Sequence, residues 1–181
     1  MSEIQLDEID RKILAALQEN GRISNVELAD RVGLSPAPCL RRVQALEAAG
    51  VIRKYVALLD PKTVGLGVTV FVQISLDLQI EARLELFEKA ILSRPEVLEC
   101  YLMTGDSDYL LRIVIPDVAS YEHLLKECLT RIESVASIKS SFALKQVKYS
   151  TALPVGVDRP APGARLQPHS PALKKGRSAG L

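Results

Sequence analysis

The chain has 181 residues, which suits either one domain of ordinary size or two small ones. Its formal net charge of +1 argues neither for nor against a nucleic-acid partner, so only the distribution of charge is informative. Its three cysteines lie far apart, which argues against a disulfide framework or a zinc site and predicts reduced core cysteines in a cytoplasmic protein. The acidic N-terminus argues against a secretory signal, and no apolar run approaches the ~20 residues of a membrane span.

The first predicted element is a helix from about Asp7 to Asn20. Asp7 is a favourable N-cap, and the Asn20-Gly21 pair is a stop signal. Four apolar residues repeat at helical spacing between these ends and predict one buried face: Ile9, Ile13, Ala16 and Leu17.

Residues 21–50, GRISNVELADRVGLSPAPCLRRVQALEAAG, predict two short helices joined by a tight turn. Ser24 and Glu27 form a Ser-x-x-Glu capping box, and Gly33 provides the left-handed residue that ends a helix. Ser35 then caps the second helix, and the proline after it suits the first helical position. Together with the first helix, this pair predicts a three-helix unit.

The second helix of this pair has two contrasting faces. Its predicted buried face consists of Cys39, Leu40, Val43 and Leu46. Small residues surround two arginines on the opposite face, where a helix-turn-helix places its second helix in the DNA major groove. The formal charge from Ser35 to Lys54 is +3, which favours contact with phosphates. The residues predicted to contact DNA are Ser24, Asn25, Ser35, Ala37, Pro38, Arg41, Arg42, Ala45, Arg53 and Lys54.

Two alternatives stay open for residues 1–59, the predicted DNA-binding domain. Amphipathic helix pairs with a glycine turn are common in helical domains, where an arginine pair usually just faces water. The segment 51–60, VIRKYVALLD, alternates like a strand. It is either a wing that places Arg53 and Lys54 near the DNA backbone or an ordinary interdomain strand before a linker at residues 60–67.

Residues 68–151 predict a second domain with the order strand, helix, strand, strand, helix, strand. The strands are expected at 68–76, 97–104, 109–115 and 138–149, the last with a bulge near Gln146, and the helices at about 80–91 and 121–132. This order predicts a ferredoxin-like βαββαβ sheet with both helices on one face, and the chain as a whole is of the α+β class. Phe71 is apolar on the more polar sheet face, which indicates that a second copy covers that face.

The remaining residues, 152–181, hold five of the ten prolines and four of the ten glycines. Their formal charge is +4, and their composition predicts a disordered tail. The tail either adds non-specific attraction to DNA or serves only to solubilise the protein.

Two stretches are specific enough to indicate a family: GRISNVELADRVGLSPAPCLRRV and GDSDYLL. With their surroundings, over about residues 4 to 150, the chain resembles the Lrp/AsnC (leucine-responsive regulatory protein) family of prokaryotic transcription regulators. The resemblance implies an N-terminal winged helix-turn-helix and a βαββαβ effector domain. It also implies homodimers that pair through their sheets and assemble further, commonly into octamers, with an amino-acid effector bound between dimers near the glycine-acid turn.

The chemistry of an amino acid fits that turn. Its ammonium needs an acceptor such as Asp106 or Asp108, and its carboxylate needs backbone N–H groups such as a glycine turn at Gly105 exposes. The alternative is that these residues simply close a hairpin. The predicted effector contacts are Met103, Thr104, Gly105, Asp106 and Asp108.

The helix-turn-helix pattern, together with what the resemblance implies, predicts a sequence-specific DNA-binding transcriptional regulator of amino-acid metabolism genes, without a cofactor other than its amino-acid effector. An enzyme is disfavoured because neither of the two histidines stands beside a plausible nucleophile and no metal-binding or phosphate-binding motif occurs. The alternative that remains is an oligomeric amino-acid sensor that does not itself bind DNA.

Overall fold

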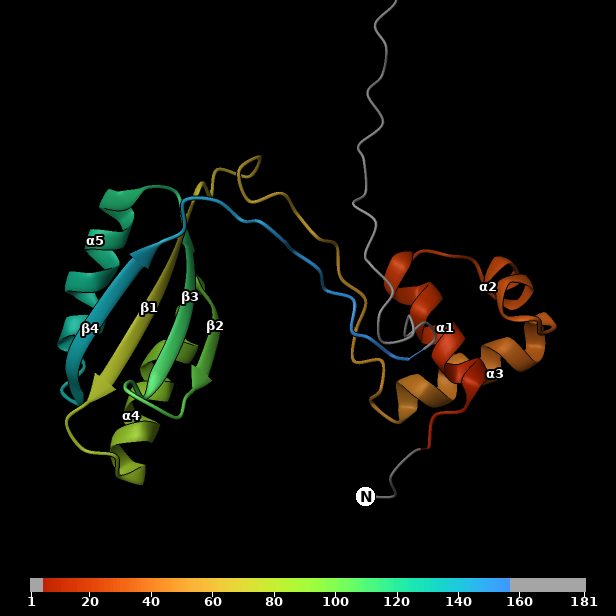
Figure 1. Cartoon of the computed structure of the whole chain (residues 1–181), viewed down its shortest axis with the longest axis horizontal. Helices are drawn as coiled ribbons and strands as arrows, with labels where there is room; N and C mark the ends of the chain where they lie inside the picture. The colour runs from red at the N-terminus through yellow and green to blue at the C-terminus, as the bar shows by residue number, and fades with distance from the viewer. Residues whose placement is uncertain (1–4, 157–181) are drawn as a thin grey trace, which may run out of the picture. The chain divides into compact units, whose positions relative to one another are not determined.

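The computed structural model of the chain describes residues 5–156, which fall into two compact units (Figure 1). Of these residues, a helical unit holds 5–55 together with 151–156, and a sheet unit holds 56–150. The predicted tail beyond residue 156 lies outside the described residues.

The helical unit contains three helices: α1 (Glu8–Glu19), α2 (Asn25–Val32) and α3 (Pro36–Ala48). Both predicted N-caps of the first two helices are confirmed. Asp7 forms a reciprocal capping box with Asp10, and Ser24 forms one with Glu27. Gly33 ends α2 with a left-handed backbone (φ 74°), which turns the chain tightly into α3.

A small core joins the three helices. Its buried members are Ile13, Leu14, Ala16, Leu28, Ala29, Val32, Cys39 and Leu46. Ile23, Leu34 and Val43 pack against this cluster from positions that are only partly buried. The core is therefore confined to the sides of the helices that face one another, and the outer side of α3 is left to solvent.

Residues 151–156 pack on α1, which the sequence did not predict. The Gln18 side chain donates to the Leu153 carbonyl (3.1 Å) and accepts from the Leu153 N–H (2.6 Å). The Arg11 guanidinium donates to the Val155 carbonyl (2.9 Å), and the Val155 side chain packs on the helical core. The expectation of a disordered tail from residue 152 is thus wrong for residues 152–156, because an amide and a guanidinium on α1 bond the backbone of Leu153 and Val155.

The strand predicted over residues 51–60 does not form. Residues 53–60 adopt neither helix nor strand, and Arg53 and Lys54 are exposed. The apolar and polar residues do alternate, but strand formation needs a neighbouring strand, and within residues 5–156 this segment pairs with none.

The sheet unit contains four strands and two helices. Its elements are β1 (Val68–Leu76), α4 (Glu81–Leu92), β2 (Val97–Leu102), β3 (Tyr109–Ile115), α5 (Val118–Glu127), a 3₁₀ turn η1 (Leu129–Arg131) and β4 (Val135–Phe142). The strand order is β2-β3-β1-β4, and all neighbours are antiparallel. The predicted βαββαβ order and the ferredoxin-like sheet are confirmed.

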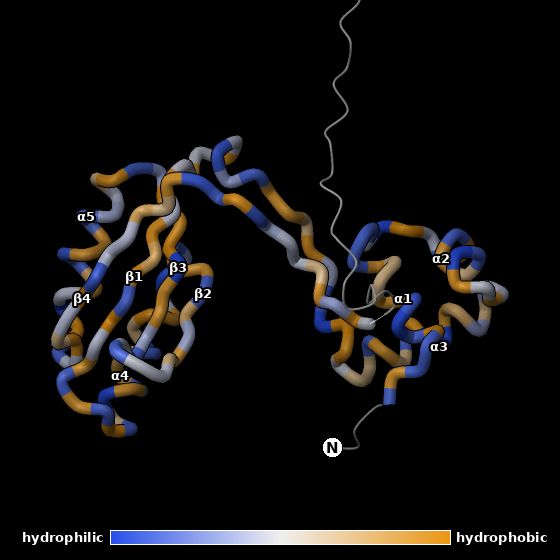
Figure 2. The backbone as a smooth tube through the Cα atoms, in the orientation of Figure 1, coloured by the Kyte–Doolittle hydropathy of each residue, from blue (hydrophilic) through white to orange (hydrophobic). Residues whose placement is uncertain are grey.

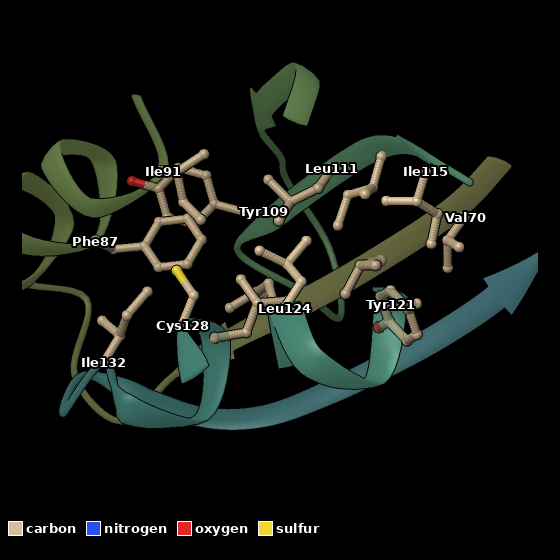
Figure 3. Packing of buried hydrophobic residues seen from close by; sticks show 14 of the residues in the cluster. Val70, Phe87, Ile91, Tyr109, Leu111, Ile115, Tyr121, Leu124, Cys128 and Ile132 are labelled. Carbon is tan, nitrogen blue, oxygen red and sulfur yellow. The ribbon is translucent and has the colours of Figure 1, made fainter. Parts of the chain in front are cut away.

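The core of this unit lies between one face of the sheet and the helices α4 and α5 (Figure 3). Alternate residues of β1, from Val70 to Leu76, point into it. The Phe87 ring of α4 lies against the Tyr109 ring of β3, with centroids 4.5 Å apart. The opposite sheet face stays open, and Phe71 is 39% exposed on it.

The last strand ends earlier than predicted. β4 stops at Phe142 instead of reaching residue 149, and the register shift in its pairing lies between Ser75 and Leu76 of β1, so the bulge predicted near Gln146 is wrong. The reason is geometric: β4 runs antiparallel to β1, and β1 begins at Val68, so the residues after Ala143 have no strand beside them.

Two further expectations concern the cysteines and membranes. Cys39 and Cys128 are buried as predicted, whereas Cys100 is exposed on the edge strand β2, so the prediction of three core cysteines is wrong for Cys100. No helix among residues 5–156 is both long enough and apolar enough to cross a bilayer.

Candidate functional site

The outer face of α3 is the first candidate site, and it includes one residue that was predicted to be buried. Cys39 and Leu46 are buried and Val43 is half-buried, whereas Leu40 is 45% exposed. Leu40 is also spaced to join the face of residues 39, 43 and 46, since it stands three residues before Val43, but it lies at the exposed edge of that face. The prediction that Leu40 belongs to the buried face is therefore wrong.

The two arginines that the sequence analysis treated as a pair lie in different surroundings. Arg42 lies three residues after Cys39, so it stands beside the core face and reaches α1. Its guanidinium donates to Asp7 (2.7 Å) and Asp10 (2.8 Å). The Asp10 backbone N–H and then the Arg42 guanidinium hold the pKa of the Asp7 carboxyl below its usual range. In this chain Arg42 ties α3 to the start of α1.

Arg41 lies on the exposed side of α3, facing away from the core. Ala37 and Ala45 are exposed near it, so the small-residue surface predicted around an arginine is present. Gln44, three residues after Arg41, is also exposed on this side, and with Leu40 it is a candidate that the sequence analysis missed. Leu40 was missed because its spacing also fits the buried face, and Gln44 was missed because nothing in the local pattern singles it out.

The other predicted DNA contacts have local structural roles or none. Ser24 caps α2, and the Asn25 amide donates to the Pro36 carbonyl (2.8 Å), which braces the turn between α2 and α3. Ser35 is the N-cap residue of α3 without a side-chain cap bond, and Pro38 is half-buried. These residues lie along the side of the helix-turn-helix that carries the start of α3.

The turn between β2 and β3 is the second candidate site. Asp108 is only 7% exposed, and its carboxylate accepts from the Leu76 N–H (2.7 Å) and from the Gln79 side chain. Its backbone closes the hairpin through Met103 (N–H to the Asp108 carbonyl, 2.8 Å) and joins β1 through Ile74 (2.8 Å). Asp108 thus braces the turn against the end of β1.

The tip of this turn is open. Met103, Thr104, Gly105 and Asp106 are exposed, and Gly105 has a φ of 122°, a conformation that side chains disfavour. The Ser75 hydroxyl contacts the Asp106 carbonyl (3.4 Å), and the structure gives no bond to the Asp106 carboxylate among the described residues. Asp106 is therefore the carboxylate of this turn that is available to an ammonium.

A helix-turn-helix with an exposed arginine on its second helix, followed by a ferredoxin-like sheet domain, is the arrangement of a two-domain DNA-binding regulator. The comparisons with known proteins agree. The family described as Lrp/AsnC ligand binding domain matches residues 69–153, and the one described as winged helix-turn-helix DNA-binding matches residues 6–53.

Several characterised proteins are similar over most of their length. The Bkd operon transcriptional regulator of Pseudomonas aeruginosa is 47% identical over 151 residues, which cover 83% of this chain and 99% of that protein. The leucine-responsive regulatory protein of Escherichia coli strain K12 is 46% identical over 148 residues, or 82% and 90% of the two chains. A transcriptional regulator of Neisseria meningitidis, crystallised as a complex with L-Met, is 44% identical with a TM-score of 0.81 over 84% of this chain and 98% of that one.

The chain belongs to the Lrp/AsnC family of transcription regulators. The resemblance noted in the sequence is confirmed, and with it the assignment of the chain as a DNA-binding transcription regulator with a ligand-binding domain. The family match to the helical unit is of the winged type, although residues 53–60 form no strand in the single chain.

Proposed function

We propose that this protein controls genes of amino-acid metabolism by binding pseudo-palindromic operators in response to a free amino acid. The observation that carries the proposal is the combination of an exposed arginine face on α3 with an open glycine-acid turn in the ligand-binding domain. The amino acid would bind at the turn, and the DNA at the helix-turn-helix.

On the DNA side, Arg41 is the base reader, because its guanidinium is unpaired among the described residues and stands between small side chains. Arginine binds the guanine edge in a bidentate manner. Arg53 and Lys54 hold phosphates, and Arg42 orients the helix through α1. Since Arg42 keeps its carboxylate partners, only Arg41 of the predicted pair contacts DNA, and Arg42 positions the helix that carries Arg41.

On the effector side, Asp106 accepts from the ammonium, and the backbone around Gly105 binds the carboxylate. Thr104 and Met103 line the same exposed stretch and are the nearest candidates to contact the rest of the ligand. Asp108 contributes by keeping the hairpin in place. The L-Met complex of the Neisseria meningitidis regulator supports an amino acid as the ligand class.

A pseudo-palindromic operator calls for two copies of the helix-turn-helix. Residues 144–149 carry Leu144, Val147 and Tyr149 at 101%, 89% and 60% exposure, and Figure 2 shows hydrophobic positions interspersed along this segment. Phe71 on the open sheet face is exposed as well. We propose that a second copy covers these surfaces in a homodimer, and that dimers assemble further, as far as an octamer. Two recognition helices related by a dyad would then meet half-sites about 34–36 Å apart.

Operator titrations with the DNA upstream of the gene, with and without each of the twenty amino acids, test this function. We expect affinity to fall steeply with salt, as phosphate neutralisation requires, and to change with one or a few amino acids. In Asp106→Ala that response should be blunted while ligand-free affinity stays near that of the wild type. A chain that binds an amino acid but shows no salt-dependent DNA binding is a sensor only.

Light scattering at micromolar concentration that finds only the 19.8 kDa monomer refutes the assembly.

A further inference from the structure

Residues 157–181 form a basic segment that neither the helix-turn-helix nor the sheet unit explains. The family match to the sheet unit ends at residue 153, so the basic segment lies beyond it. The segment contains one acidic residue, Asp158, and five basic residues, which give it a formal charge of +4. These basic residues are Arg159, Arg165, Lys174, Lys175 and Arg177. Most of the positive charge that this chain has in excess is therefore concentrated in one segment.

The residues just before the basic segment are attached to α1 (Figure 1). Gln18 forms two hydrogen bonds with the backbone of Leu153, and the Arg11 guanidinium donates to the Val155 carbonyl (2.9 Å). Gly156 lies beside Arg11, since a Cβ on this glycine would be 3.7 Å from the Nη1 of Arg11. The chain therefore enters the basic segment from a fixed point on α1.

This point lies close to the recognition helix. Asp10, the residue before Arg11, accepts a hydrogen bond from Arg42 of α3 (2.8 Å). Arg159 follows Gly156 by three residues, so their Cα atoms are at most about 10 Å apart. That distance is comparable with the width of one α-helix. The first cation of the basic segment is therefore within reach of DNA that lies against α3.

The helical unit itself offers DNA little net charge. Its residues 5–55 include eight basic and seven acidic residues, which gives a formal charge of +1. Three of the basic side chains form ion pairs with carboxylates of the same unit: Lys12, Arg31 and Arg42. A DNA duplex has one negative charge for about every 1.7 Å of its axis, and affinity rises with each phosphate that a protein cation neutralises. The basic segment supplies the cations that the helical unit lacks.

The sheet unit is the competing partner for this segment. Its residues 56–150 include thirteen acidic and ten basic residues, which gives a formal charge of −3. Five of the acidic residues form ion pairs within the unit: Asp77, Glu99, Glu122, Glu127 and Glu133. A duplex presents on the order of ten negative charges over about 20 Å. This density, together with attachment to the helical unit, favours DNA as the partner.

We propose that the basic segment is a second DNA contact, which binds phosphates beside the operator and reads no base. It strengthens binding to operator and unrelated DNA alike, because phosphate contacts carry no sequence information. The proposal rests on DNA binding by the helix-turn-helix, which substitutions in residues 157–181 leave intact.

Salt titrations of DNA binding test this contact, with the DNA upstream of the gene and a random-sequence duplex of equal length as probes. The full chain is compared with a chain that ends at Gly156 and with a neutralised full-length chain. The neutralised chain has five substitutions: Arg159→Gln, Arg165→Gln, Lys174→Gln, Lys175→Gln and Arg177→Gln. We expect both altered chains to bind both duplexes at least about tenfold more weakly at about 0.1 M salt, with a slope of log K against log salt that is less steep by about two or more. The preference for the operator should not change.

The matched control keeps every charge of the basic segment: Arg159→Lys, Arg165→Lys and Arg177→Lys. It should bind both duplexes with the wild-type slope, because counterion release depends on charge. An unchanged slope in the truncated chain overturns the proposal and leaves a segment that only solubilises. Weaker binding by the truncated chain but not by the neutralised one also overturns it, and so does tighter binding by the truncated chain, which indicates the sheet unit as the partner. If the full chain binds neither duplex, the DNA-binding function fails as well.

The attachment to α1 is tested by Gln18→Ala, which removes both hydrogen bonds to Leu153 without changing any charge. The substitution should weaken DNA binding by the full chain more than DNA binding by the chain that ends at Gly156. The reason is that a detached segment has a lower effective concentration beside the DNA. Equal effects in the two chains overturn the role of the attachment, because any general loss of stability in the helical unit is common to both.

Discussion

The two units of this chain are stabilised in different ways. The sheet unit has one continuous core of fifteen buried residues, whereas the helical unit has eight. The helical unit also has polar contacts outside its core: two capping boxes, the ion pairs of Arg42 with α1, and the hydrogen bonds of residues 151–156 to α1. Small domains bury a smaller fraction of their surface, so each polar contact outside the core contributes a larger share of the stability of the helical unit.

This difference assigns separate tasks to the units. The sheet unit is a scaffold whose loop between β2 and β3 holds the glycine turn. The helical unit presents Arg41 on a helix whose orientation depends on contacts outside its core. A residue that forms such a contact affects DNA binding indirectly, through the position of α3, and so differs in kind from a residue that contacts a base.

The largest expected effect is in the core of the sheet unit. Phe87→Ala removes a fully buried ring that lies against Tyr109, and such truncations cost about 3–5 kcal/mol of unfolding free energy. Leu92→Ala, at an 86% exposed position of the same helix, is the matched control and should change little. Thermal and urea unfolding of both variants measures the contrast, and equal losses would show that α4 does not pack as the structure has it.

The second effect separates the two arginines of α3. Arg41→Ala should weaken operator binding by about 1–3 kcal/mol and relax preference at one base pair, with the melting temperature unchanged, because its side chain faces solvent. Arg42→Ala should lower the melting temperature of the helical unit slightly, since both of its carboxylate partners reach solvent.

Operator titrations against single-base variants, combined with melting curves, decide between these roles. If Arg42→Ala relaxes the preference at one base while Arg41→Ala does not, the two arginines have exchanged roles and α3 is rotated on DNA relative to this structure.

These arginines show where sequence reasoning reaches its limit. The caps of α1 and α2 and the end of α2 at Gly33 were predictable, because each depends on neighbours a few residues away, as for Ser24 with Glu27. The partners of Arg42, Asp10 and Asp7, lie thirty-two and thirty-five residues earlier in the chain, and no local sequence pattern predicts these contacts. In the same way, the position of the glycine turn was predictable, but not that Asp108 faces inward to Leu76 while Asp106 stays free.

A smaller effect tests the attachment of residues 151–156 to α1. Gln18→Ala removes two hydrogen bonds to the Leu153 backbone, which should cost about 1 kcal/mol or somewhat more in the helical unit, and leave the sheet unit unaffected. Gln44→Ala, which removes an exposed glutamine of α3, is the control for stability. Hydrogen exchange of the α1 amides measures the effect, and unchanged protection would show that the attachment does not stabilise the unit.

The smallest effect is the response of the capping boxes to acid. The Ser24 hydroxyl, followed by the Ser24 N–H, lowers the pKa of Glu27 from its ordinary 4.5, and the Asp10 N–H and Arg42 lower that of Asp7 from 3.8. A carboxyl with a depressed folded pKa stabilises the fold above its unfolded pKa and loses that contribution as the pH falls through the folded value. The helical unit should therefore lose stability progressively below about pH 4.5.

The sheet unit also has lowered carboxyls, notably Glu99 beside Arg112, so acid alone does not separate the two units. Glu27→Gln does separate them. Glutamine fills the same capping position without titrating, so the variant should melt like the wild type near neutral pH and lose less stability on acidification, in the helical unit only. Calorimetric melts from about pH 7 to about pH 3 compare the two proteins. If the variant shows the same acid loss as the wild type, the Glu27 carboxylate does not contribute to the pH dependence, and the other carboxyls of the unit with a lowered pKa, Asp7 and Glu8, must account for it.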